Sequence, residues 1–573
     1  MGVPGFAKWL SNKKKLSKTF IKDLTKNINA LYLDANCLFH PQCFKTLKDA
    51  NTKDINKLEK KMFERIIEYI DFLINEVKPT EYVYIAVDGV APLAKMNQQR
   101  KRRFKGVIDK EKENNIKQKY NKEISEWSNI VITPGTEFME KLHKFIIKYI
   151  KSKNKNGIKY IYSSYHVFGE GEHKILNHIK KNIKNNSNIV IYGLDADLIS
   201  LAMASQKKNI FLMREASQFN NKLSSNDVKE EINYMDIDKL KELFSEYIYD
   251  EINNKYEILT NKKYNYTKLT NDFIILLILL GNDFLPHFPS ININQNGLDY
   301  ILEAYIKGFI CFCDENNFLV NFKNNKITIN QKLLQYILND LADLEDEFFI
   351  EELPKYIYKH QNKKCFVSDP YDVEIWNHNM IKDIKIEDKI KLGSDIPDMW
   401  KFRYYNEYFK CNEFYKETVN NASYKYIEGI IWIARYYFEE CPSPIWQYPY
   451  THTPFISDVA DYLADSKINI NDIKFKQEEP LTPCQQLLAV IPPVYYNILP
   501  INYKKLATSY ESPIIKYFPL NYDIDYVNKF ILHEAIPMIM NVNPNDIKNA
   551  TYNVKLNKDE KIRNKYSDVL EFE

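Results

Sequence analysis

The sequence predicts an α/β fold in which a mixed or parallel central sheet is flanked by helices. Short apolar runs alternate with stretches of helical periodicity through the first half of the chain, and each apolar run leads to a carboxylate. The apolar runs, typical of buried parallel strands, are residues 31–33, 82–87 and 189–192. The helical stretches between them are residues 62–75, 138–149 and 175–183. Because open parallel sheets bind ligands at the carboxyl ends of their strands, the acids at these ends are site candidates.

Composition shifts predict four parts of the chain. Residues 1–340 are expected to form the core that carries the site. From Asp340 to Glu352 there are seven acids and no base, and the polar stretch that follows fits neither a strand nor an amphipathic helix, so residues 341–396 are expected to be an acidic and polar connection. Residues 397–545, rich in Tyr, Trp and Pro, predict a second, mostly helical region that packs on the core and closes over the site. Residues 546–573 are expected to be a charged tail.

Composition also excludes several classes of protein. With 45% hydrophobic and 27% charged residues, the 573-residue chain is neither collagen-like nor wholly disordered. Its longest apolar stretch, residues 273–280, is far shorter than the ~20 residues of a membrane-spanning helix and predicts a buried helix. No export or lipidation signal is found, so we expect a soluble, intracellular protein. The eight cysteines form no Cys-x-x-Cys pair, which argues against a zinc site and a disulfide framework.

Seven carboxylates stand at the ends of predicted elements, and they are Asp34, Asp88, Glu170, Glu172, Asp195, Asp197 and Asp283. Any one of them alone is equally well explained as a helix cap or a turn residue. Seven such groups cannot crowd together unless their pKa values rise or divalent cations neutralise them, and ligand sets made only of oxygen suit Mg²⁺ or Mn²⁺. Two such ions about 4 Å apart are the usual arrangement for phosphodiester cleavage. The chemistry predicted is hydrolysis of nucleic acid.

Cations are concentrated in one stretch, although the net charge is only +3. Residues 95–122 hold eleven bases and three acids, an excess expected where a polyanion binds but also compatible with a solvated helix surface. On a helix counted from Lys95, Gln99 lies at about 40°, Arg102 at about 340° and Arg103 at about 80°. This face predicts a pocket for a terminal phosphate, because Arg offers forked donors. Arg100 and Lys101 point elsewhere and are expected on a backbone-binding or solvated surface.

Ordered motifs along most of the chain resemble those of XRN-type 5′→3′ exoribonucleases. In the first part they are Met1-Gly-Val-Pro, Leu31-Tyr-Leu-Asp-Ala-Asn, Ala86-Val-Asp-Gly-Val-Ala-Pro, Ala94-Lys-Met-Asn-Gln-Gln-Arg, Pro134-Gly-Thr-Glu-Phe-Met, Gly169-Glu-Gly-Glu-His-Lys-Ile, Gly193-Leu-Asp-Ala-Asp-Leu and Gly281-Asn-Asp-Phe-Leu-Pro. In the second part they are Trp400-Lys-Phe-Arg-Tyr-Tyr, Tyr426-Ile-Glu-Gly, Cys441-Pro-Ser, Ile456-Ser-Asp and Leu487-Leu-Ala-Val-Ile-Pro-Pro. The resemblance implies a PIN or flap-nuclease-like core in a short form of the family, without the long carboxyl-terminal extension of its large members.

The resemblance also implies roles for individual residues. The seven acids would hold the metal, with two ions of Mg²⁺ or Mn²⁺ expected, and Lys95, Gln99, Arg102 and Arg103 would hold a 5′ monophosphate. Family members sandwich terminal bases between a His and a Trp, and stacking of this kind tolerates any base. His40 matches that His, and Trp446 is the candidate for the Trp. Without the resemblance, the sequence favours a structural histidine for His40 and a core position for Trp446.

The function predicted is processive 5′→3′ hydrolysis of 5′-monophosphorylated single-stranded RNA to mononucleotides, as in RNA decay. A structure-specific 5′ nuclease of the flap endonuclease type is one alternative, and a non-catalytic RNA-binding scaffold is another. A partner that removes a cap or a pyrophosphate first, the oligomeric state and the RNA targets stay open. The cytoplasm is the compartment favoured, with a nuclear or viral compartment as alternatives.

Overall fold

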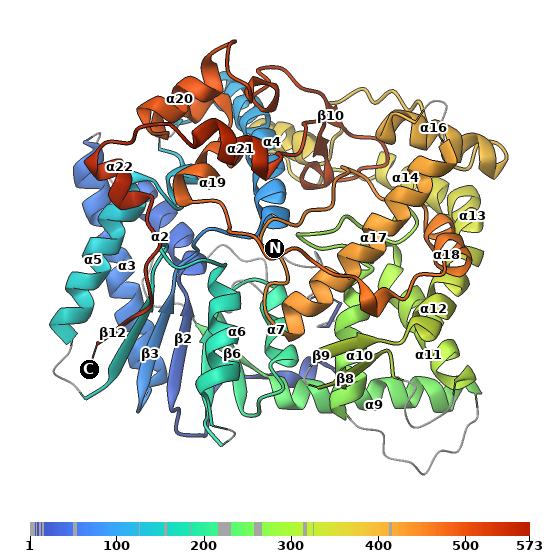
Figure 1. The fold of residues 1–573 in the computed structure, drawn as a ribbon, viewed down its shortest axis with the longest axis horizontal. Helices are drawn as coiled ribbons and strands as arrows, with labels where there is room; N and C mark the ends of the chain where they lie inside the picture. Colours follow the sequence, from blue (N-terminus) through green and yellow to red (C-terminus); the bar gives the residue numbers. More distant parts are fainter. Residues whose placement is uncertain are drawn as a thin grey trace.

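An eight-stranded mixed sheet forms the first part of the structure (Figure 1). The structure is a computed structural model that describes residues 6, 9–10, 13, 16–49, 54–124, 127–153, 157–184, 186–215, 231–256, 266–312, 318–324, 326–411 and 415–572, without the side chains of 254–256. In spatial order the strands are β1 (Phe20–Ile21), β7 (Ile232–Asp236), β6 (Ile210–Glu215), β5 (Ile189–Tyr192), β2 (Ala30–Asp34), β3 (Tyr82–Ala86), β4 (Lys159–Ser163) and β12 (Leu570–Phe572). The five strands from β6 to β4 are parallel, and β1, β7 and β12 pair antiparallel at the edges.

Helices bury both faces of the sheet. Leu31 and Leu33 belong to one hydrophobic core and Tyr32 to the other, because alternate strand residues point to opposite faces. The helices of the first core are α2 (Ala35–Asp49), α3 (Ile55–Val77) and α5 (Glu137–Lys153). Those of the second are α6 (Gly171–Asn182), α7 (Asp197–Ala204), α9 (Ile237–Tyr256) and α10 (Tyr266–Ile278). Burial on both faces explains why the strands read as continuous apolar runs.

The rest of the chain is mostly helical and packs beside and above the sheet (Figure 1). Its helices are α11 (Gly297–Cys311), α12 (Gln331–Asp343), α13 (Glu345–Glu347), α14 (Leu353–Gln361), α15 (Pro370–Asn379), α16 (Pro397–Phe409), α17 (Tyr415–Phe438), α18 (Ile456–Asp465), α19 (Pro483–Val490), α20 (Ile501–Thr508), α21 (Pro544–Thr551) and α22 (Lys558–Arg563). Two hairpins join them, β8 (Val320–Lys323) with β9 (Lys326–Ile329) and β10 (Ile524–Asp525) with β11 (Ile536–Pro537). Most of α17 is buried in the core that also holds α6, α7 and α10, so this helix ties the two parts together.

The structure confirms the predicted α/β fold with its aromatic, helical second region. The three predicted strands are β2, β3 and β5, and the apolar stretch at 273–280 lies in α10 and the turn after it. The other five strands of the sheet were not predicted: β4 and β6 within it, and β1, β7 and β12, which pair antiparallel. The division into four parts stays a prediction, and the Met1-Gly-Val-Pro motif lies outside the described residues.

Residues 341–396 contain more helix than their polar composition predicted. A π-helix, Phe348–Glu352, links α13 to α14, and α15 follows a coil. The start of α15 carries a local signal that sequence reasoning missed: the Asp369 carboxylate accepts hydrogen bonds from the amides of Tyr371 and Asp372, and Pro370 occupies the first turn. Within the described ranges, no helix combines the length and the apolar character needed to cross a bilayer.

Helix α4 (Leu93–Lys119) leaves the end of β3 and packs against α19 in a third hydrophobic core. The structure corrects the expectation for Arg100, which is 1% exposed rather than solvated. Its guanidinium donates hydrogen bonds to the carbonyl oxygens of Ala489, at 2.8 Å, and Tyr517, and it stacks on Phe104. A second helix packed on this face of α4 is the physical reason. Lys101 is half-buried.

The turn after β3 approaches the loop before Glu170 so closely that only glycine fits. A Cβ on Gly89 would overlap the carbonyl oxygen of Val167, while the Gly89 amide donates a hydrogen bond to Gly169 at 2.9 Å. We therefore expect Gly89→Ala to lower the free energy of unfolding by about 1–3 kcal/mol, measured by urea denaturation. Gly106→Ala is the matched control: its Cβ meets open space in the middle of α4, and alanine there should stabilise by up to about 1 kcal/mol. Equal stability of both variants would contradict this interpretation.

Candidate active site

The seven predicted acids lie at the ends of the elements that the sequence predicted. Asp34 is the last residue of β2 and Asp88 follows the end of β3. Glu170 stands at the N-cap position of α6, and Glu172 lies in that helix's first turn. Asp195 lies between β5 and α7, Asp197 opens α7, and Asp283 follows α10. Except Asp88 and Asp195, which are half-buried, all are less than a tenth exposed.

The end of β2, the end of β3 and the start of α6 meet at Gly171. Its amide donates a hydrogen bond of 2.7 Å to Asp88 Oδ1. A Cβ at this position would stand 2.8 Å from Asp34 Oδ1 and 3.4 Å from Asp88 Oδ1. The glycine between Glu170 and Glu172 is therefore required by the close approach of two further carboxylates.

Lys95 lies inside the cluster. Its Nζ is 2.6 Å from Glu170 Oε1 and 2.6 Å from Asp283 Oδ2, and the lysine is 9% exposed. Gln98, one turn along α4, donates a hydrogen bond of 3.2 Å to the other oxygen of Asp283. Helix α4 thus supplies an internal counter-charge that joins the start of α6 to the turn after α10.

The pKa values of the acids reflect their burial and their mutual repulsion. Burial and the charge of Asp88 raise the pKa of Asp34 to about 7. Burial and the charge of Asp195 raise the pKa values of Glu172 and Asp197 well above their usual range. Burial opposes ionisation of Asp283 too, but the charge of Lys95 outweighs it and lowers that pKa. One lysine cannot neutralise the whole cluster.

The donor set fits divalent cations. Buried carboxylates with raised pKa values gain their charged form when a cation binds among them. One oxygen of Glu172, Oε2, is buried and has no hydrogen-bond partner among the described residues, as expected of an atom that a metal would engage. One ligand atom from each of Glu170, Glu172 and His173 lies within 4.8 Å of the other two. Sequence reasoning missed His173, although it directly follows Glu172 in the motif.

The predicted phosphate residues lie on the first half of α4, and the structure separates Lys95 from the other three. Lys95 points into the acids, whereas Arg102 is exposed and Arg103 donates a hydrogen bond of 2.9 Å to Thr133 Oγ1. Among the described residues, the buried atoms Arg103 Nη1 and Gln99 Oε1 have no hydrogen-bond partner. Burial and the charge of Arg102 lower the pKa of Arg103 to about 9. Such a group gains from an anion beside it.

Four of the six lysines of the basic run beyond this point pair with acids. Lys105 and Lys117 pair with Asp109 and Glu113 one turn away. Near the end of α4, Lys112 pairs with Asp383 and Lys119 with Glu374, which lies in α15. The cationic surface that the sequence predicted over 95–122 is therefore concentrated in its first third.

His40 lies close enough to Arg102 and Arg103 for their charges to act on its ring. Burial and the charges of Arg102 and Arg103 lower the pKa of His40 to about 4, so the ring is neutral at pH 7. Its Nδ1 is 3.5 Å from Asn129 Nδ2. Its stacking role stays a prediction.

Trp446 lies in the core of the second region. It is 9% exposed, its ring stacks on Trp432 with 5.1 Å between centroids, and its Nε1 donates a hydrogen bond of 2.9 Å to Glu428. The role of base-stacking partner stays a prediction for Trp446, and this packing does not favour it.

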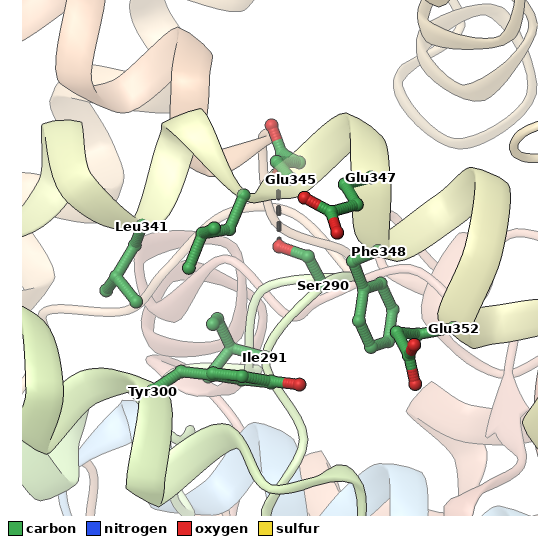
Figure 2. A pocket seen from close by; sticks show the side chains of 9 residues that line it. Ser290, Ile291, Tyr300, Leu341, Glu345, Glu347, Phe348 and Glu352 are labelled. Atoms are coloured by element: carbon green, nitrogen blue, oxygen red, sulfur yellow. Dashed lines mark hydrogen bonds between the residues drawn. The ribbon is translucent and has the colours of Figure 1, made fainter.

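A separate cavity of about 120 Å³ lies under the π-helix (Figure 2). The Tyr300 ring forms one wall, the carboxylate of Glu347 points inward, and Ser290 donates a hydrogen bond of 3.2 Å to Glu345. Among the residues that the structure describes, none of the predicted site residues lines this cavity. It does not belong to the acid cluster.

The mixed sheet with carboxylates gathered at one edge defines a PIN-like α/β domain. The chain belongs to the XRN family of 5′-3′ exonucleases: the family's sequence profiles match it at residues 1–216, as "XRN 5'-3' exonuclease N-terminus", and at residues 263–369 and 355–572, as "Xrn1 helical domain". Nucleases of this family are metal-dependent. The recognition of the family from its motifs is confirmed.

Curated relatives match the whole chain. It is 28% identical to "5'-3' exoribonuclease 1" of Saccharomyces cerevisiae, over 100% of this chain and 44% of that protein. Identity is 30% to the human protein of the same name, over 100% and 35%, and 28% to "5'-3' exoribonuclease 2 homolog" of Drosophila melanogaster, over 99% and 73%. The chain therefore spans less than half the length of the first two relatives.

The raised pKa of Asp34 predicts a dependence of stability on pH in the absence of metal. Because its native pKa of about 7 exceeds the unfolded value of about 3.9, the native state binds more protons between these values. The stability that this carboxyl contributes is therefore present at low pH and is lost as pH rises through about 7. In EDTA, the melting temperature of the wild-type protein should therefore fall, relative to that of Asp34→Asn, as the pH rises from about 5 to about 8.

Saturating Mg²⁺ should remove that difference, because a bound cation favours the charged carboxylate. Thermal unfolding of both proteins, with and without the ion, measures the effect. Parallel curves for the two proteins in EDTA would mean that Asp34 is not held protonated.

Proposed function

We propose that this chain is a processive 5′→3′ exoribonuclease that hydrolyses single-stranded RNA with a 5′ monophosphate and releases mononucleotides. The observation that carries the proposal is the joining of two features by one helix. Helix α4 places Lys95 in a largely buried cluster of seven carboxylates and, one to two turns later, presents Gln99, Arg102 and Arg103. The relatives named 5'-3' exoribonuclease support the same reading.

The seven carboxylates would hold two Mg²⁺ ions. Bound there, the ions would supply an activated water and neutralise charge on the reacting phosphate. The protein's own part is to hold the acids in place: Gly171 fixes Asp34 and Asp88 at the start of α6, and Lys95 holds Glu170 against Asp283. Their burial strengthens every charge interaction in the site.

Gln99, Arg102 and Arg103 would hold the 5′ phosphate. Arg103 is oriented by Thr133 through one nitrogen, while its other terminal nitrogen is buried with no hydrogen-bond partner among the described residues. A phosphate oxygen would satisfy that donor. By its size and charge, such a pocket would accept a single phosphate and exclude a cap or a triphosphate. A neutral His40 beside the pocket would stack on a terminal base.

No described feature favours the flap endonuclease or the scaffold. All seven acids are present, and α17 of the second region reaches Glu170 through the Tyr436 hydroxyl. A cap-removing or pyrophosphate-removing partner would have to act first on RNA that lacks a 5′ monophosphate. The cytoplasm remains the compartment that we favour, with nuclear and viral compartments as alternatives.

Degradation of a 3′-labelled single-stranded RNA tests the proposal. With Mg²⁺ the 5′-monophosphorylated RNA should disappear without long intermediates, while the 5′-triphosphate and 5′-hydroxyl forms persist. EDTA should stop the reaction, and Asp197→Asn, which removes one buried acid, should lower the rate at least ~100-fold. Equal cutting of all three RNAs, or internal products, would favour an endonuclease. RNA binding without any cleavage would favour the scaffold.

Arg103→Ala tests the phosphate pocket separately from the acids. Loss of charge-assisted hydrogen bonds worth about 1.5–3 kcal/mol should lower kcat/KM for 5′-monophosphorylated RNA about 10- to 100-fold. The slow reaction of 5′-hydroxyl RNA should not change, because it offers no phosphate to the pocket. Lys110→Gln is the matched control, a cation of the same helix beyond the pocket, and it should leave both rates within about twofold. An equal fall for both RNAs in Arg103→Ala would place Arg103 outside the pocket.

A further inference from the structure

The second region reaches the acids through aromatic side chains of α17, of which Tyr436 makes the closest contact with α6 and Tyr437 meets the His173 ring edge to face, with 5.9 Å between centroids. The Tyr436 ring stacks on the ring of His173 in α6, with 3.6 Å between centroids and 11° between planes. Its hydroxyl donates a hydrogen bond of 3.4 Å to Glu170 Oε2. Tyr436 and His173 are both 4% exposed, so this contact is wholly internal.

The same ring also contacts the second acid-bearing segment. Phe284, next to Asp283, meets Tyr436 edge to face with 5.6 Å between centroids and 81° between planes. Trp432, one turn earlier in α17, packs on Tyr436 at 4.9 Å and on Phe284 at 5.3 Å. Tyr436 therefore lies between the start of α6 and the turn after α10.

We propose that Tyr436 is a positioning residue that fixes Glu170 and Glu172 relative to Asp283, so that the site binds its metal ions at full affinity. This inference rests on the proposed function for the role of those ions. The carboxylates of the two segments repel each other, and Lys95, which attracts both, is a flexible side chain. A stacked aromatic ring has few rotatable bonds and holds its neighbours at a set distance.

The direction of the hydroxyl separates this role from space-filling. Two other buried tyrosines of the second region direct their hydroxyls to backbone carbonyls: Tyr426 donates to Pro286 at 3.2 Å and Tyr448 to His452 at 3.0 Å. Tyr436 instead donates to a carboxylate of the site. Burial and the charge of Glu170 raise the pKa of Tyr436 well above its usual range, so the hydroxyl stays a neutral donor.

Binding of Mn²⁺ to the full chain, followed by electron paramagnetic resonance, tests the proposal without requiring activity. Tyr436→Leu, which removes the flat ring, should weaken Mn²⁺ binding about 10-fold or more, as loss of outer-sphere support does at metal sites. Tyr436→Phe keeps the stack on His173 but removes the hydrogen bond to Glu170, and it should weaken Mn²⁺ binding measurably but less, by about threefold. Tyr448→Phe is the matched control, because it removes a buried hydroxyl that donates to the His452 carbonyl and not to an acid of the site, and its affinity should not change.

The RNA assay supplies a second readout. For Tyr436→Leu, the Mg²⁺ concentration that gives the half-maximal rate should rise by the same factor as the Mn²⁺ dissociation constant, while KM for RNA at saturating Mg²⁺ stays within about twofold. A folded Tyr436→Leu protein with wild-type Mn²⁺ affinity would overturn the proposal. Where that variant fails to fold, Tyr436→Met, whose flexible side chain can adapt to the space without a ring, is judged by the same criterion. Wild-type protein that binds Mn²⁺ but leaves RNA intact would overturn the proposed function alone.

Discussion

The concentration of buried carboxylates around Lys95 is the constraint on which the rest of the structure depends. Isolated charges are costly to bury, and like charges in a low dielectric repel strongly. Lys95 relieves this for Glu170 and Asp283 through two contacts of 2.6 Å, but the pKa values of Asp34, Glu172 and Asp197 remain raised. Without a bound cation these carboxylates repel one another, and the surrounding fold must therefore hold them together against that repulsion.

Several elements of the fold hold the carboxylates in place. Parallel strands bring Asp34 and Asp88 to one edge of the sheet, and Gly171 lets α6 begin directly against them. Helix α10 ends at the turn that carries Asp283, and α17 covers that turn and the start of α6 with aromatic rings. Burial by the second region is thus part of the electrostatics of the site, because it excludes the water that would weaken every charge interaction.

Local patterns predicted the strands and their acids because a buried parallel strand leaves a continuous apolar run, and the acid follows where the run ends. Contacts between segments that are distant in sequence produce no such local pattern. Helical-wheel arithmetic placed Arg100 off the Lys95 face correctly, yet it could not show that α19 packs there and takes the guanidinium inside. In the same way, nothing in the periodicity around His173 pointed to Tyr436, which is 263 residues further along the chain. The short helix α15 was different, since Asp369 and Pro370 gave a local signal that the polar composition obscured.

Helix α4 gives the proposed reaction its geometry. Lys95 and Arg103 are separated by eight residues of one uninterrupted helix, a rise of ~12 Å along its axis. Hydrogen bonds fix the helix at two points. At its start the Leu93 amide donates to the carbonyl oxygen of Pro444, and further along the Arg100 guanidinium donates to carbonyl oxygens of the second region. A terminal phosphate bound near Arg103 would therefore sit at a set distance from the acids around Lys95. On the proposed function, the rigid helix α4, and not the recognition of a base, would fix where the strand is cut. An enzyme that degrades any sequence requires a cutting position that does not depend on the bases.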